Sequence, residues 1–221
     1  MWDAFLKWPV DEIPYGLSTL CQNVKGAFLE WDWFRVYDFM EFVSKTEGHP
    51  CPLLFIEQSN KALEREVSGY RFIGDVIAPI TNGMEIEEIE EAAQSPLAGV
   101  REHIITALSL FADRENPDYR NSIKESISAV EAICRIIADD EKATLGQALK
   151  VVKKKVGLHP ALEQGFSNIY GYTNDADGIR HAQGFLDQSN LGSEDARYFL
   201  VSCSAFVNYL TEKAQKSCVK F

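Results

Sequence analysis

The residues from Arg120 to Asp140 carry the periodic pattern that most constrains the fold. In RNSIKESISAVEAICRIIADD the apolar side chains recur three and four positions apart, as one face of an amphipathic helix requires. The residues of this stripe are Ile123, Ile127, Val130, Ile133, Cys134 and Ile137. The pattern predicts a long helix that buries one face against neighbouring helices.

Similar spacing recurs along most of the chain, so we expect a mainly α protein. The other predicted helices cover residues 15–31, 33–46, 53–68, 84–94, 97–113, 144–157, 161–174 and 193–215. The one clear β signal is YRFIGDVIAPI at 70–80, two short runs rich in aromatic and branched residues. Gly74 and Asp75 join the two runs and suit the type II′ turn of a β-hairpin.

Two parts follow from this order of elements. Residues 1–94 form an N-terminal helical region with the β-hairpin at about 70–80. Residues 95–221 hold five predicted helices joined by short loops, which is typical of a helical bundle. No Gly/Ser-rich linker separates the two parts, so we expect them to pack together.

Charge and cysteine usage exclude several classes of protein. The net charge of −11 weighs against a general nucleic-acid-binding surface, but 13 Lys/Arg and 26 Asp/Glu precede residue 145, while nine and seven follow. If the chain meets RNA, we expect the C-terminal third to be the contact face; the alternative is a solvated acidic surface with a few lysines. The five cysteines include no CxxC pair, which argues against a disulfide framework or a zinc site and for reduced thiols in the cytoplasm. No run of apolar residues is long enough for a membrane span, so we expect no membrane partner.

The sequence offers few candidate catalytic or ligand-binding residues. The usual motifs for nucleotide, metal or acyl-transfer sites are absent, so no cofactor or metal is expected. The stretch NDADGIRHA differs, because Asp177 stands three positions before Arg180 and four before His181. On a helix these three side chains share a face and have the parts for phosphodiester cleavage: a histidine to move a proton and an arginine to hold a phosphate. The alternative is a helix start with an aspartate cap and a salt bridge.

A second cluster, Arg120, Asn121 and Lys124, lies where the long helix is expected to begin. Arg120 and Lys124 are one turn apart and could grip a phosphate, although two cations at a helix N-terminus oppose the dipole and need compensation. Glu115, Asp118 or a ligand would supply it. The alternative is an exposed helix start with Glu125 as the local partner of these cations. His103, in the helix before, is expected to be structural.

Three segments, ENPDYRNSIKESISAVEAICRII, GYTNDADGIRHA and EDARYFLVSCSAFVNYL, occur in this order and resemble the HEPN-like helical domain of AbiJ-type abortive-infection proteins of bacteria. SGYRFIGDVIAPIT resembles the region that leads into that domain, and the resemblance covers roughly residues 37–212. It implies a bundle of helices that often pairs into homodimers, and frequently a metal-independent endoribonuclease of phage defence.

The resemblance also implies a place for the active site. HEPN domains keep an arginine and a histidine four to six positions apart near the start of the last helix, and GIRHAQG occupies that place here. Arg180 and His181 therefore carry over, but they are adjacent, and neighbours on a helix point about 100° apart. The other candidate, Arg120-Asn121, has Glu125 where the histidine would fall.

Two functions are expected on these grounds. The first is a bacterial defence protein that binds RNA or a nucleotide and has a degenerate ribonuclease motif, with catalysis open. In it a homodimer would complete the site by bringing two such turns together. The second is a non-catalytic regulatory module that contacts a basic protein through its acidic N-terminal part.

Overall fold

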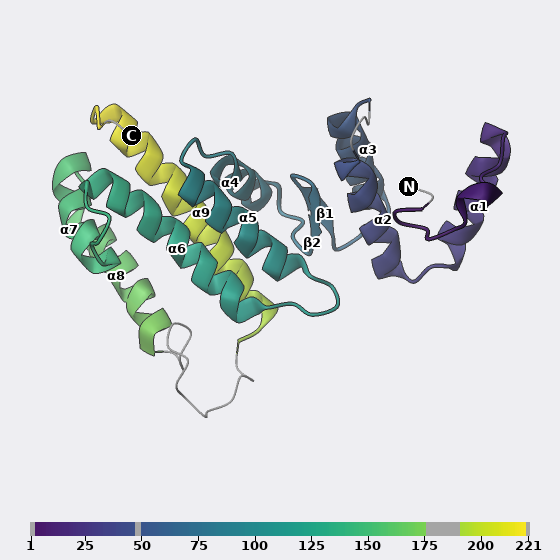
Figure 1. Ribbon diagram of the computed structural model, residues 1–221. Helices are drawn as coiled ribbons and strands as arrows, with labels where there is room; N and C mark the ends of the chain where they lie inside the picture. Colours follow the sequence, from purple (N-terminus) through teal and green to yellow (C-terminus); the bar gives the residue numbers. More distant parts are fainter. Residues whose placement is uncertain (1–2, 47–49, 176–190, 220–221) are drawn as a thin grey trace. The chain divides into compact units, whose positions relative to one another are not determined.

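The computed structural model describes residues 3–46, 50–175 and 191–219, and it is mainly α-helical as the sequence predicts. Contacts divide the chain into two compact units, Met1–Pro79 and Ile80–Phe221. Figure 1 shows the elements of both, and each unit is taken separately below. Within the described part of the chain, no helix combines the length and apolarity that crossing a membrane requires.

The N-terminal unit holds three α-helices and a β-hairpin among its described residues. Its elements are a short 3-10 helix at Val10–Glu12, α1 (Leu17–Glu30), α2 (Trp33–Lys45), α3 (Pro52–Arg65), β1 (Arg71–Ile73) and β2 (Val76–Ala78). Pro52 occupies the first turn of α3, where its missing N–H has no intrahelical partner to lose. Phe5, Trp31, Phe39 and Phe42 form an aromatic cluster, with ring centroids 5.2–5.8 Å from Phe5.

The predicted hairpin is present with a two-residue loop. Ile73 pairs with Val76, Phe72 with Ile77 and Arg71 with Ala78 in antiparallel register. Gly74 has a φ of +58°, the left-handed value that the first position of a type II′ turn requires and that favours glycine.

Side chains from the helices satisfy the outer edges of this hairpin. The side-chain amide of Asn60 in α3 donates to the Phe72 carbonyl at 3.1 Å and accepts from the Phe72 N–H at 2.7 Å. On the other strand, a Glu41 carboxylate oxygen in α2 accepts from the Ile77 N–H at 2.8 Å. Asn60 and Glu41 thus stand where neighbouring strands would, so a two-stranded sheet leaves these backbone groups paired.

The C-terminal unit is a helical bundle. Its elements are α4 (Gly83–Ala93), α5 (Ala98–Ala112), α6 (Tyr119–Ala138), α7 (Leu145–Val156), α8 (Pro160–Asp175) and α9 (Ser193–Lys216). The long helix α6 packs against α5, α7 and α9, and Figure 1 shows α6 and α9 beginning at the same end of the bundle. All the apolar residues of the predicted α6 stripe are buried, which confirms that this stripe faces the core.

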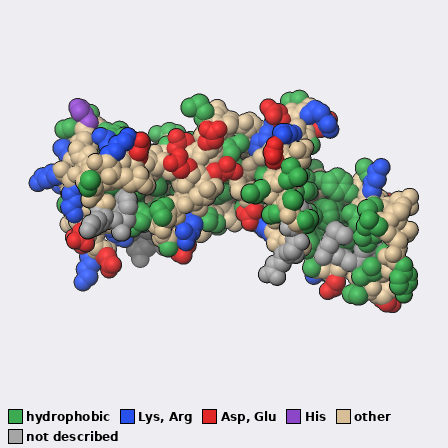
Figure 2. All heavy atoms as spheres, turned by 90° about the horizontal axis from the view of Figure 1, so that it is seen from above, with side chains coloured by type: hydrophobic (Ala, Val, Ile, Leu, Met, Phe, Trp, Pro, Cys, Tyr) green, Lys and Arg blue, Asp and Glu red, His purple; other side chains and the backbone are tan. Residues whose placement is uncertain are grey.

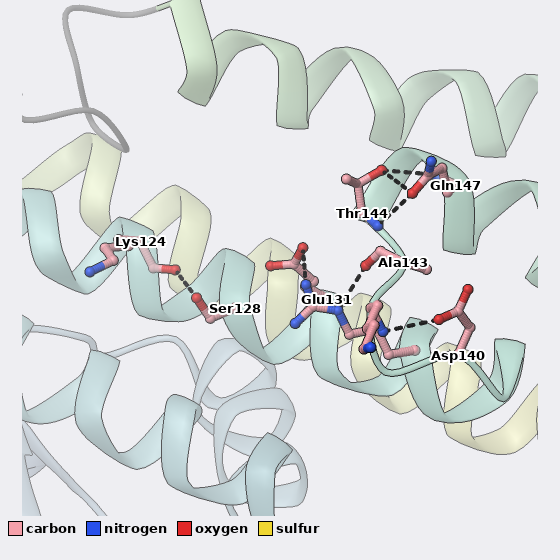
Figure 3. Close-up of polar contacts among 9 residues, drawn as sticks. Lys124, Ser128, Glu131, Asp140, Ala143, Thr144 and Gln147 are labelled. Carbon is pink, nitrogen blue, oxygen red and sulfur yellow. Dashed lines mark hydrogen bonds and ion pairs between the residues drawn. The ribbon is translucent and has the colours of Figure 1, made fainter.

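Capping residues fix both ends of α7, as Figure 3 shows for its start. The Thr144 hydroxyl accepts from the Gln147 N–H while the Gln147 side chain accepts from the Thr144 N–H, a capping box. The preceding corner is held from α6, because Arg135 donates through Nε to the Ala143 carbonyl at 2.8 Å. Gly157 ends the helix with a φ of +66°.

Two polar contacts tie α4 to α9. Arg197 donates through Nε and Nη2 to one carboxylate oxygen of Glu85, at 2.9 and 2.6 Å. One turn of α4 further on, the Asn208 side chain donates to both the carbonyl and the carboxylate of Glu88. Ile89, which follows Glu88, is fully buried, so α4 is part of the bundle core.

Candidate functional site at the start of helix α6

The cluster predicted near the last helix cannot be placed. Asp177, Arg180 and His181 lie outside the described residues, which stop at Asp175 in α8 and resume two positions before α9. Their shared face, and the choice between an aspartate cap and a catalytic group, stay predictions.

The second predicted cluster lies in the first two turns of α6. Asp118 is the N-cap residue, and one of its carboxylate oxygens accepts from the Asn121 N–H at 3.0 Å. The other oxygen accepts from the side-chain amide of Asn121 at 2.6 Å. Asp118 therefore places a negative charge at the positive end of the helix dipole. It is one of the compensating groups that the sequence suggested for Arg120 and Lys124.

Lys124 is the most open cation of this cluster. Its side chain is exposed, while Arg120, one turn earlier, is half-buried. Figure 3 shows the amino group of Lys124 pointing away from the other residues drawn, and its backbone carbonyl accepting from the Ser128 hydroxyl. The start of α6 thus offers an ammonium group for a phosphate, and the Asn121 amide already serves the cap.

Glu125 has a partner that sequence reasoning did not assign. Its carboxylate lies 2.6 Å from Nδ1 of His103, which is in α5 and 22 positions earlier in the chain. The sequence offered Glu125 as a local partner of the α6 cations. The structure instead shows a hydrogen-bonded pair between two helices, with side chains 37% and 21% exposed for His103 and Glu125.

The antiparallel register of α5 and α6 creates this pair. Near the connecting loop, the Asp118 N–H donates to the Leu110 carbonyl at 3.0 Å. One turn further, the Ser122 hydroxyl donates to the Ala107 carbonyl at 2.8 Å. Continuing by another turn brings residue 103 opposite residue 125. A short loop between two predicted helices indicates an antiparallel pair, but the register depends on side-chain packing between the helices, which sequence spacing does not reveal.

The groups near the start of α6 have complementary chemistry. A carboxylate holds the imidazole of His103 in one orientation, and Lys124 stands next to Glu125 in the sequence with an exposed ammonium group. Within the described residues, no group of three or more His, Cys, Asp or Glu side chains is arranged to hold a metal ion. The arrangement suits the binding of an anion and the transfer of a proton.

Comparison with known proteins identifies one family. Residues 3–95 match the model of the family described as AbiJ N-terminal domain 4. This match supports the AbiJ-type part of the resemblance and ends just before α5, so it does not cover the segments that resemble HEPN domains. No curated protein and no solved structure shows a significant match to the chain.

Proposed function

We propose that this chain is an abortive-infection-type defence protein of bacteria, whose C-terminal bundle is HEPN-like, binds RNA or a nucleotide, and cleaves RNA. The observation that carries the proposal is the match of residues 3–95 to AbiJ N-terminal domain 4, because AbiJ-type proteins are abortive-infection proteins. The helical bundle that follows supports it, since the first and the third of the segments that resemble HEPN domains form α6 and α9.

In this proposal the residues have distinct roles. Arg180 binds the phosphate, His181 transfers a proton and Asp177 orients the imidazole. Arg120, Asn121 and Lys124 add phosphate contacts. Since adjacent arginine and histidine cannot both face one phosphate within a helix, we propose that two copies of the chain form a homodimer and share the site.

The charge distribution of the C-terminal third supports contact with RNA there. Lys150 and Lys154 lie one turn apart on α7, and both are exposed. Figure 2 shows Lys and Arg side chains gathered over the part of the C-terminal unit where α7 lies. RNA binding through such cations should weaken steeply as salt is raised, because bound counterions are released.

Cells that express the chain give the direct test. We expect the wild-type protein to slow growth and degrade cellular RNA, and an Arg180→Ala/His181→Ala double variant at equal abundance to do neither. The purified protein should cleave a mixed RNA substrate in excess chelator, and light scattering should give the mass of a dimer. Intact RNA in both assays, or toxicity that survives the double substitution, would remove the ribonuclease from the proposal.

One observation favours the second function, contact with a basic protein. Glu87 and Glu91 lie one turn apart on α4, and both are exposed. Under this function, pull-down would capture a basic protein, release it in high salt, and fail with Glu87→Gln/Glu91→Gln. That result together with intact RNA would favour the regulatory module.

A further inference from the structure

The contact between His103 in α5 and Glu125 in α6 has the geometry of a positioned proton-transfer group. A carboxylate has no hydrogen to donate, so Nδ1–H of His103 donates to Glu125 across the 2.6 Å contact. This bond fixes the ring orientation. In the neutral imidazole it leaves Nε2 as the nitrogen with the lone pair. A histidine used as a general base is held in the same way, by an acceptor on one nitrogen while the other takes the proton.

The surroundings of this pair are polar and open. His103 is 37% exposed, so solvent or a ligand reaches the ring. Thr106 lies one turn further along the outer face of α5 and is exposed, and Asn121 lies one turn before Glu125 on α6. Lys124, next to Glu125, adds an exposed ammonium group on the same stretch of helix.

We propose that His103 is a catalytic residue for RNA cleavage and that Glu125 is its positioning residue. This inference rests on the proposed ribonuclease function and assigns its proton acceptor to His103 on α5 in place of His181. Nε2 of His103 takes the proton of a ribose 2′-hydroxyl, the 2′-oxygen bonds to the adjacent phosphorus, and the bond from phosphorus to the 5′-oxygen breaks. The leaving oxygen takes a proton from water, and the imidazolium then returns its proton to the solvent.

The competing explanation is that the His103–Glu125 contact only joins two helices. The variant His103→Asn distinguishes this structural role from a catalytic one. An asparagine side chain retains an N–H donor near the position of Nδ1, so the contact with Glu125 survives. The same substitution removes Nε2 and with it the proton acceptor. A structural role therefore predicts little change in this variant, whereas a catalytic role predicts loss of cleavage.

The experiment measures cleavage and binding of a labelled RNA by the purified full-length chain in excess chelator. We expect His103→Asn and His103→Ala to cleave roughly 100-fold more slowly or worse, with RNA affinity and melting temperature close to wild type for His103→Asn. Added imidazole should restore part of the rate of His103→Ala. Lys124→Ala should weaken RNA binding, and an RNA with 2′-deoxyribose at the cleaved position should stay intact. Glu163→Gln, which breaks the Lys153–Glu163 ion pair of 3.3 Å between α7 and α8, is the matched control and should keep the wild-type rate.

Two results would overturn parts of this scheme separately. A wild-type chain that leaves every RNA intact removes the proposed ribonuclease function, and the catalytic role of His103 with it. A wild-type chain that cleaves RNA while His103→Asn cleaves equally well removes this inference alone and leaves the pair as a contact between helices. Cleavage that His181→Ala abolishes and His103→Asn does not would assign the chemistry to the segment before α9.

Discussion

The Asn60 side chain makes the hydrogen bonds that a neighbouring strand would make at the edge of the hairpin. Its removal should destabilise this strand locally. Asn60→Ala leaves both the N–H and the carbonyl of the fully buried Phe72 without their side-chain partner. We expect the free energy of opening at this strand to fall by about 1–3 kcal/mol, the usual cost of an unsatisfied buried backbone group. Hydrogen exchange of the Phe72 amide measures this change directly.

Asn23→Ala is the matched control, since Asn23 is exposed on α1. Its loss should leave the exchange of Phe72 unchanged. Equal exchange in the two variants would mean that Asn60 does not hold the strand edge.

The cysteines should divide into two classes by reactivity. Cys134 and Cys203 are buried, whereas Cys21, Cys51 and Cys218 are exposed. Burial raises the pKa of the Cys203 thiol to about 12, and burial together with the negative charge of Glu131 raises the pKa of Cys134 still further. Because only the thiolate reacts, a raised pKa removes the reactive form at pH 8.

A thiol-reactive dye at pH 8 should therefore modify three cysteines quickly in the native chain and all five in denaturant. Raising the pH to 9 should leave Cys134 and Cys203 slow, because their raised pKa values keep both thiols protonated. Five fast sites in the native chain would show that the packing around α6 and α9 opens readily.

Sequence spacing predicts where a residue lies within one helix, but it does not predict contacts between two helices. Arg120, Asn121 and Lys124 lie in the first turns of α6 as predicted, because spacing within one helix decides their places. The pairing of His103 with Glu125 joins residues 22 positions apart, so it depends on the register between α5 and α6. No pattern within either helix encodes that register, so the sequence suggested the cations of α6, and not His103, as partners of Glu125.

At the scale of elements, helix interiors were predictable, and several ends were not. The sequence predicts a helix over residues 53–68, but α3 ends at Arg65, and Val67 takes the left-handed conformation with a φ of +56°. A branched residue rarely adopts it, so tertiary contacts must compensate. Ser68 supplies one of them, because its hydroxyl bonds to Tyr37 across to α2, and its N–H also closes the end of α3 by donating to the Leu63 carbonyl.

The start of α5 shows a similar displacement. Ser95 and Pro96 suggest a cap followed by the first turn, yet α5 begins at Ala98 and Leu97 stands at the N-cap position without a side-chain bond. The Ser95 hydroxyl instead accepts from the Leu97 N–H, and its carbonyl accepts from Arg101. The signal was correct for a turn but placed the start of the helix two residues early.

Two glycines of α7 should respond in opposite directions to the same substitution. A methyl group would meet nothing within 4 Å at either Gly146 or Gly157, so space does not distinguish them. Gly157 has a φ of +66°, where alanine is strained, and Gly157→Ala should cost about 1 kcal/mol. Gly146 is helical, and Gly146→Ala should be neutral or stabilise by up to about 1 kcal/mol. Denaturant unfolding of the two variants measures both, and effects of the same sign would contradict the argument.

At the scale of the whole molecule, α4 has two affiliations. The family match to residues 3–95 includes it with the N-terminal domain, and the sequence likewise suggested a boundary near residue 94. By contacts, however, the chain divides after Pro79, and α4 packs on α5 and α9. An acidic amphipathic helix does not reveal its partner, because the arginine that pairs with Glu85 comes 112 positions later.

Fragments of the chain can decide which boundary is physical. A fragment of residues 80–221 retains α4 and should unfold cooperatively, with its amides protected from exchange. A fragment of residues 95–221 lacks α4, so it loses the buried Ile89 and Ala92 and leaves Arg197 and Asn208 without their partners on that helix. Burial of one large apolar side chain contributes about 1.5–3 kcal/mol, so the shorter fragment should be less stable by several kcal/mol and prone to aggregate. A shorter fragment that matches the longer one in denaturant midpoint would place the boundary at residue 94 and show that α4 contributes little to the bundle.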